Sequence, residues 1–128
     1  MNNLITLIQS KPDFYKLNPA SDEQIINAES ELSLTFSEDY KVFLRAFGVA
    51  SFEGHEIVGI CNSSRLNVVE ITKENKIKNP NIPSDFYVIE ELNINGIIIL
   101  QNKNGEVFQT LGQEKPVKIA NSLIEYIG

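Results

Sequence analysis

The chain has 128 residues, a net charge of −6 and 42% apolar residues. The negative charge argues against duplex nucleic acid as a partner, because phosphates are bound by basic surfaces, and it favours attraction to a basic protein. A chain of this length buries about two-thirds of its unfolded surface, enough for one core, so we expect a single α+β domain over residues 1–128.

The first predicted element is a short helix over residues 3–9, with Leu4, Ile5 and Ile8 on one side at helical spacing. It ends at residues 11–12, Lys-Pro, because the residue before a proline disfavours the helical conformation. Three of the residues that follow are expected to cover an edge of the core: Phe14, Tyr15 and Leu17.

A second helix is predicted after Ser21, whose hydroxyl can cap backbone N–H groups while Gln24 reaches back to the Ser21 amide. Its inner face carries Ile25, Ala28 and Leu32. Glu29 falls about 60° from the centre of that face, at the edge of the core. We expect its carboxylate to be fixed by backbone amides or a basic side chain and to tie this helix to a loop.

A third helix is predicted from Ser37, its cap, to Gly48, its stop. Glu38 and Asp39 lie in its first turn, where negative charge complements the helix dipole. One face carries an aromatic and aliphatic stripe at i, i+3, i+4 and i+7: Tyr40, Phe43, Leu44 and Phe47. We interpret this stripe as core that a sheet covers, rather than as a platform for stacking nucleic-acid bases.

These patterns resemble the SUKH superfamily, which groups yeast cell-wall assembly regulators with bacterial immunity proteins against secreted toxins. The matching residues are Ile25, Ala28, Glu29, Leu32, Phe36 to Tyr40, Phe43, Leu44, Phe47, Gly48, Ile57 and Gly59. The sequence departs from the usual pattern at Phe36-Ser37, where Leu-Pro is common, and at Gly48-Val49, where two glycines are common.

The resemblance implies a non-enzymatic binding module, an immunity protein that neutralises a cognate toxin such as a nuclease by direct binding. Two alternatives remain open at this point. One is a regulatory or scaffold protein with a cellular partner, as the yeast relatives imply, and the other is a small enzyme of unrecognised type.

Residues 50–60 are predicted to be extended, with a turn at Glu53-Gly54. Residues 66–77 are ambiguous, because Val68, Val69 and Ile71 favour a strand whereas the wider apolar spacing suits a helix. The resemblance implies a helix there, and we predict one.

The second half of the chain predicts an antiparallel meander over residues 86–89, 97–100 and 107–110. Its turns are Asn95-Gly96 and Asn104-Gly105, since both residue types accept positive φ. The run of three isoleucines at 97–99 indicates a central strand covered on both faces, with the N-terminal helices on one of them. Val117 and Ile119 precede a short C-terminal helix over residues 120–127, with Leu123, Ile124 and Ile127 inward.

No motif for catalysis or cofactor binding is found. The sequence lacks glycine-rich phosphate loops, a Gly-x-Ser-x-Gly elbow and a His-x-x-x-His pair. His55 and Cys61 are the only residues of their types, but six residues of strand would separate them by roughly 20 Å. We therefore predict no catalytic residues, no metal and no cofactor, with Cys61 a small buried apolar group.

The location is predicted to be the cytoplasm, without contact to a membrane. The N-terminus has no basic region before its apolar residues, and the longest aliphatic run is only residues 97–100. A single cysteine excludes an internal disulfide and suits a reducing compartment.

The predicted partner surface is the loop after Gly48, where an aromatic residue lies among acidic ones: Phe52, Glu53, His55 and Glu56. A competing interpretation is that Phe52 only plugs the edge of the sheet. The next candidates are Glu106 and two adjacent residues, Glu90 and Glu91. Because adjacent strand residues point to opposite faces, these two carboxylates are not expected to share one site.

Overall fold

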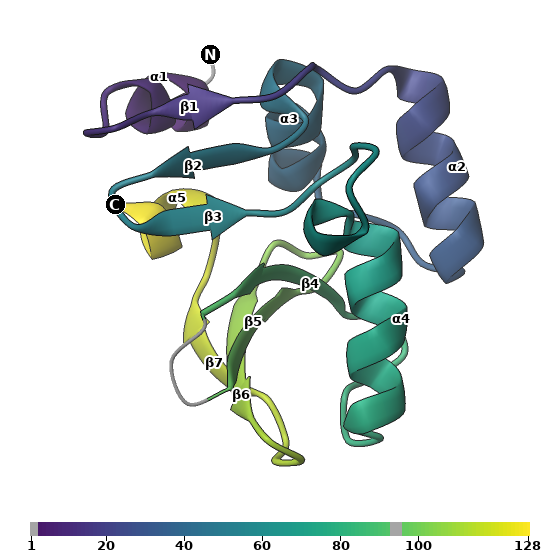
Figure 1. The fold of residues 1–128 in the computed structure, drawn as a ribbon. Helices are drawn as coiled ribbons and strands as arrows, with labels where there is room; N and C mark the ends of the chain where they lie inside the picture. The colour runs from purple at the N-terminus through teal and green to yellow at the C-terminus, as the bar shows by residue number, and fades with distance from the viewer. Residues whose placement is uncertain (1–2, 93–95) are drawn as a thin grey trace.

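Five α-helices and two antiparallel sheets form the part of the chain that the structure, a computed structural model, describes: residues 3–92 and 96–128 (Figure 1). The helices are α1 (Asn3–Gln9), α2 (Asp22–Leu32), α3 (Glu38–Phe47), α4 (Val68–Lys78) and α5 (Leu123–Ile127). The strands are β1 (Tyr15–Lys16), β2 (Ala50–Phe52), β3 (His55–Ile57), β4 (Tyr87–Glu91), β5 (Ile97–Gln101), β6 (Val107–Leu111) and β7 (Val117–Ala120). The predicted α+β class is confirmed.

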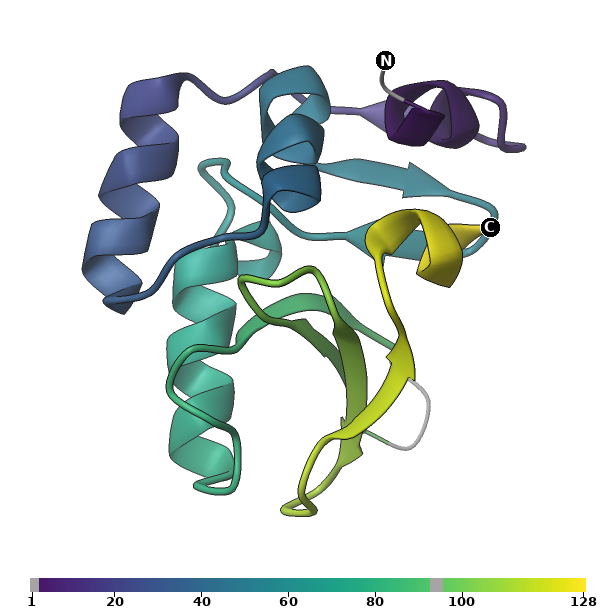
Figure 2. The same ribbon diagram turned by 180° about the vertical axis from the view of Figure 1, so that it is seen from behind.

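The first sheet, in the order β1-β2-β3, has one covered face and one open face. Helices α1, α3 and α5 lie over the covered face, as the view from behind shows (Figure 2). Buried residues point toward these helices, among them Ala50, Phe52 and Ile57. On the open face, Tyr15 is paired with Ser51 and Ser51 with Glu56, so the three side chains form one row across the sheet.

The second sheet is the predicted meander, in the order β4-β5-β6-β7. The turn at Asn104-Gly105 is confirmed, because the Asn102 side chain accepts hydrogen bonds from the Asn104 and Glu106 amides while Gly105 adopts φ +88°. The turn predicted at Asn95-Gly96 falls on residues 93–95, which lie outside the described residues. Strand β5 is central, as the run of isoleucines predicts.

Helix α3 lies where the two sheets meet, and its stripe is core. The four stripe residues are no more than 1% exposed: Tyr40, Phe43, Leu44 and Phe47. At one end Tyr40 contacts Tyr87 of β4, and its hydroxyl donates to the carbonyl oxygen of Val58 (2.7 Å). Burial raises the pKa of both tyrosines, so these hydroxyls remain protonated hydrogen-bonding groups.

Two glycines make close backbone contact at the end of α3. Gly48 ends the helix with φ +71°, and a Cβ atom built on Gly59 would lie 1.7 Å from the Gly48 carbonyl oxygen. No side chain fits at Gly59 without moving backbone, which explains why a glycine stands there.

Glu29 ties α2 to the loop before α3. Its Oε2 accepts a hydrogen bond from the Phe36 backbone N–H (2.8 Å) and lies 3.8 Å from the Lys41 ammonium. The same helix begins with the expected capping box between Ser21 and Gln24. Both features were predicted from the sequence alone.

Several details differ from the sequence predictions. Helix α2 packs against α3 and α4, and it is α4 that lies along β4 of the meander (Figure 1). The helix predicted over residues 66–77 is present but spans residues 68–78, because Asn67 caps its start by accepting hydrogen bonds from the Val69 and Glu70 amides. Ala120 belongs to β7, since Ser122 rather than an earlier residue caps the last helix.

Three side chains expected inside are more exposed. Ile124 is 40% exposed, because a helix of five residues turns only one narrow face toward the core. Tyr15 is 65% exposed on the open sheet face, where no helix covers it. Cys61 is half-buried, in a loop where its Sγ lies 3.5 Å from the Ser63 carbonyl oxygen. Among the described residues no helix is long and apolar enough to cross a membrane.

Candidate partner-binding surface

The β2–β3 hairpin holds the predicted contact residues in a tight two-residue turn. Phe52 pairs with His55, and the intervening Glu53 and Gly54 both adopt positive φ, +49° and +83°. This combination matches the right-handed twist of a hairpin. The turn is fixed to the first loop, because the Glu53 N–H donates to the Pro12 carbonyl and its carboxylate lies 3.5 Å from the Lys11 ammonium.

Phe52 is a core residue, which corrects its interpretation as an exposed anchor. Its side chain is 1% exposed and lies on the covered face of the first sheet, with its ring 5.6 Å from the His55 ring. An aromatic group in this position stabilises the fold and is not accessible to a partner. The competing interpretation, in which Phe52 fills the edge of the core, describes its place.

Glu90 is also buried, at 1% exposure, and is therefore not a surface contact. Its carboxylate accepts hydrogen bonds from the Tyr126 hydroxyl (2.6 Å) and the Glu56 backbone N–H (3.0 Å), and it lies 3.1 Å from His55 Nδ1. A buried carboxylate is tolerated only with such donors around it. Glu90 therefore joins β3, β4 and α5.

The same contacts determine the protonation of the partners. The hydrogen bond to Glu90 raises the pKa of His55, and the charge of Glu53 adds to it, while burial and Lys11 oppose the shift. Burial, followed by the bond to Glu90, raises the pKa of the Tyr126 phenol, which stays a donor. His55 thus forms its side-chain contact with Glu90, as a structural ion pair when the imidazole is protonated. It does not pair with Cys61, whose Sγ lies next to the Ser63 carbonyl oxygen.

Glu56 and Glu91, by contrast, reach the surface at one place. The Arg65 guanidinium donates to both Glu56 oxygens, at 2.8 and 3.4 Å, and Glu56, Arg65 and Glu91 line one small hollow together with Val58. As expected, the two neighbouring carboxylates do not share one site: Glu90 is buried, whereas Glu91 lines this surface hollow. We call Tyr15, Ser51, Glu56, Arg65 and Glu91 the open polar surface.

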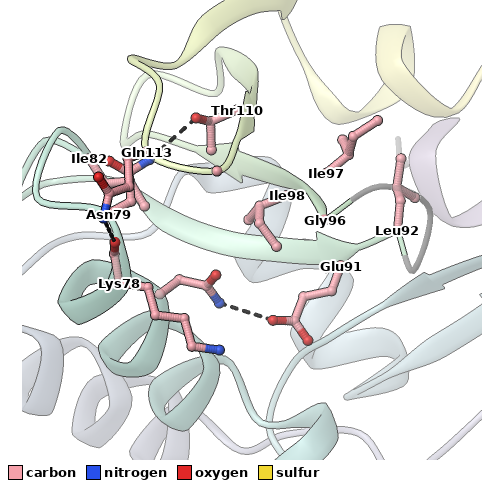
Figure 3. A pocket seen from close by; sticks show the side chains of 12 residues that line it. Lys78, Asn79, Ile82, Glu91, Leu92, Gly96, Ile97, Ile98, Thr110 and Gln113 are labelled. Carbon is pink, nitrogen blue, oxygen red and sulfur yellow. Dashed lines mark hydrogen bonds between the residues drawn. The ribbon is translucent and has the colours of Figure 1, made fainter.

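Glu91 also borders a larger hollow of about 370 Å³ between α4 and the meander (Figure 3). Figure 3 shows Glu91 reaching from the end of β4 toward α4, with Ile98 on the floor and Thr110 on the next strand. The other polar residues around it come from the last turn of α4 and the turn after β6: Asn75, Lys78, Asn79 and Gln113. We call this the α4–β5 hollow.

The side chains that could serve catalysis or metal binding, chiefly those of the acidic residues, His55 and Cys61, are separated or make structural contacts. Within residues 3–92 and 96–128, no three His, Cys, Asp or Glu side chains are grouped so that they could hold a metal ion. The one histidine is bound to Glu90, and Cys61 faces its own loop.

Sequence reasoning missed four residues of this region. Tyr15 was assigned to the core, because nothing in the sequence shows that the first sheet has an open face. Tyr126 and Arg65 meet Glu90 and Glu56 through contacts between distant segments, which spacing cannot show. Asn75 carried a usable signal, since a polar residue on the inner face of the predicted helix indicates a buried hydrogen bond.

The fold and this surface define an α+β protein whose polar residues are presented on an open sheet face. The chain belongs to the SUKH superfamily: the sequence pattern of its SMI1-KNR4 cell-wall family (SUKH_5) matches residues 1–128. At the level of the family, such domains are toxin-immunity or related protein-binding modules and are generally non-enzymatic. A comparison with curated proteins found no match.

Proposed function

We propose that this protein is an immunity protein that neutralises a cognate bacterial toxin, a nuclease or similar effector, by direct binding as a single domain in the cytoplasm. The observation that carries the proposal is the match of the SUKH family pattern to residues 1–128. Its action needs neither catalysis nor a cofactor, and neither nucleic acid nor a membrane is its partner. Its mechanism is occupancy of the toxin surface.

The open polar surface, together with the adjacent Glu53, is where the toxin binds in this proposal. Tyr15 replaces Phe52 as the aromatic anchor, because it is 65% exposed and lies in the same cross-strand row as Glu56. Aromatic side chains with acidic neighbours suit a basic partner, which the carboxylates steer and the ring holds. His55, 29% exposed, contributes at the hairpin's edge.

The test uses the cognate toxin, sought as the product of a gene adjacent to this one, in a calorimetric titration. Glu53→Lys with Glu56→Lys should slow association and weaken binding more than tenfold, about 1.4 kcal/mol, while the protein stays folded. The melting temperature should fall only slightly, because the ion pairs lost to Lys11 and Arg65 are exposed. Tyr15→Ala should weaken binding mainly by faster dissociation. Glu38→Lys is the matched control, because this carboxylate is 89% exposed and lies on α3.

Unchanged affinity in the double variant would place the toxin elsewhere on the protein. The family's cell-wall description supports a second candidate, a regulatory or scaffold protein with a cellular partner. A pull-down that leaves the neighbouring toxin behind but retains a cellular protein, in a manner sensitive to the same double variant, would favour this second function.

A further inference from the structure

The α4–β5 hollow has a floor with a defined order of side chains. Glu91 pairs with Ile98 and Ile98 with Thr110, so these residues of β4, β5 and β6 form one row on the face of the meander that looks toward α4. Figure 3 shows this row, with Leu92 and Ile97 near the Glu91 end. The row changes from a carboxylate through an aliphatic group to a hydroxyl.

The donors at the far end of the row are used within the protein. Thr110 donates to the Glu114 carbonyl (2.7 Å), and Asn79 Nδ2 donates to the same carbonyl (2.9 Å). The Gln113 side chain donates to the Lys78 carbonyl (3.2 Å). This end of the hollow is therefore closed by internal hydrogen bonds and offers a ligand little hydrogen-bonding capacity.

The acceptors at the Glu91 end are not used up. Asn75 Nδ2 donates both to the Ile71 carbonyl (2.9 Å) and to Glu91 Oε2 (3.0 Å). Because both partners are acceptors, the Asn75 amide must turn its nitrogen toward them, and its Oδ1 accepts from no described residue. No side-chain polar atom of the described residues is both buried and unpaired, so this oxygen keeps access to solvent, and Asn75 is one of the residues that line the hollow.

Glu91 has capacity left as well. Its carboxylate accepts that one hydrogen bond and forms no ion pair with a described residue, since Arg65 is engaged by Glu56. A partly buried carboxylate beside a free amide oxygen and an aliphatic floor calls for a donor that carries positive charge on an apolar stem.

We propose that the α4–β5 hollow receives the side chain of an arginine or lysine from the protein partner. Its methylene stem lies on Ile98 and Leu92, and its charged head donates to Glu91 and Asn75 Oδ1. The inference rests on the proposed function, because it names the chemistry of the residue that a toxin inserts beside the open polar surface. Lys78 also lines this hollow, and its positive charge opposes the bound cation.

The test titrates the labelled full-length protein with a blocked tripeptide, acetyl-Ala-Arg-Ala-amide, and follows amide resonances by NMR. Saturable shifts are expected at Ile98, Thr110 and the Asn75 side-chain amide. The same tripeptide with citrulline, a neutral isostere of arginine, should bind several-fold more weakly. Glu91→Gln should reduce the arginine affinity to the citrulline level, whereas Glu38→Gln, which changes an 89% exposed carboxylate on α3, should not change it.

A second variant, at Lys78, tests whether the side chain bound in the hollow is positively charged. Lys78→Gln should tighten binding of the arginine peptide. Weaker binding in Lys78→Gln, equal affinity for arginine and citrulline, or the absence of saturable shifts in the hollow would each overturn the proposal. The peptide assay contains no toxin, so its failure leaves the proposed function standing. A failed toxin titration beside a positive peptide titration would overturn only the proposed function.

Discussion

The Glu90 cluster predicts a specific dependence of stability on pH. The folded-state pKa of His55 lies above its ordinary value of 6.5, because Glu90 stabilises the charged imidazole. The ion pair therefore stabilises the fold fully below about pH 6.5, and its contribution is lost as pH rises through the raised pKa. Replacing Glu90 by Gln removes the charge while keeping the size. The free energy of unfolding of this variant should therefore change little as the pH rises from 6 through the raised pKa of His55.

The size of the effect follows from the geometry. In Glu90→Ala, the donors from Tyr126, Glu56 and His55 lose their acceptor inside the protein, which should cost about 3–5 kcal/mol. In His55→Ala, one hydrogen bond to a charged group is lost, about 1.5–3 kcal/mol in the interior. Because His55 is 29% exposed, we expect the lower end of that range, about 1.5 kcal/mol, at pH 6.

Two measurements check this reasoning. The protein has one histidine, so a single imidazole resonance in NMR reports the pKa of His55 directly. Urea unfolding from pH 6 to pH 9, in a Cys61→Ser background that removes the thiol titration, gives the stability profile. If Glu90→Gln and the parent lost stability in parallel across this window, His55 would not be coupled to Glu90.

The other predictions concern the core and its backbone, and urea unfolding measures all of them. Phe43→Ala should cost about 3–5 kcal/mol, whereas Arg45→Ala on the outer face of α3 should cost about 0.5 kcal/mol or less; equal losses would mean that the inner face is wrongly assigned. Gly59→Ala should cost about 3 kcal/mol, because its Cβ would meet the Gly48 carbonyl. A near-neutral effect of Gly59→Ala would show that the backbone segments around Gly48 and Gly59 move apart easily. Glu29→Ala should cost about 1–3 kcal/mol by leaving a backbone N–H without its acceptor, and Glu29→Gln about 1 kcal/mol at most; a reversed order would refute the capping role.

Local patterns in the sequence were sufficient to predict most of the elements. The caps at Ser21 and Ser37, the stop at Gly48 and the hairpin at Asn104-Gly105 each depend on residues within a few positions of one another. Such short-range chemistry is readable from one sequence. The aromatic stripe of α3 was equally readable, because its spacing leaves a single apolar face.

The positions of the partner residues were less predictable. Phe52 and Tyr15 have exchanged the roles predicted for them, because burial depends on which face of the first sheet the helices cover. The same holds for Glu90, which in the sequence looks like an exposed acid at the end of a strand but is enclosed by β3 and α5. Charge and polarity indicate exposure only when no distant segment supplies donors.

The hydrogen bonds of Asp39 bear on the order in which the chain folds during its synthesis. Asp39, near the start of α3, accepts hydrogen bonds from the Gln101 side chain (3.0 Å) and from the Leu123 backbone N–H (2.9 Å), which is 84 residues further along the chain. Helix α5 has five residues, too few to be stable alone. Because the Leu123 N–H at its start is bound by Asp39, α5 is stabilised by α3. Helix α3 leaves the ribosome before either donor to the Asp39 carboxylate has been synthesised. The amide protons of α5 should therefore exchange with solvent together with those of α3, rather than by fraying from the end of the chain.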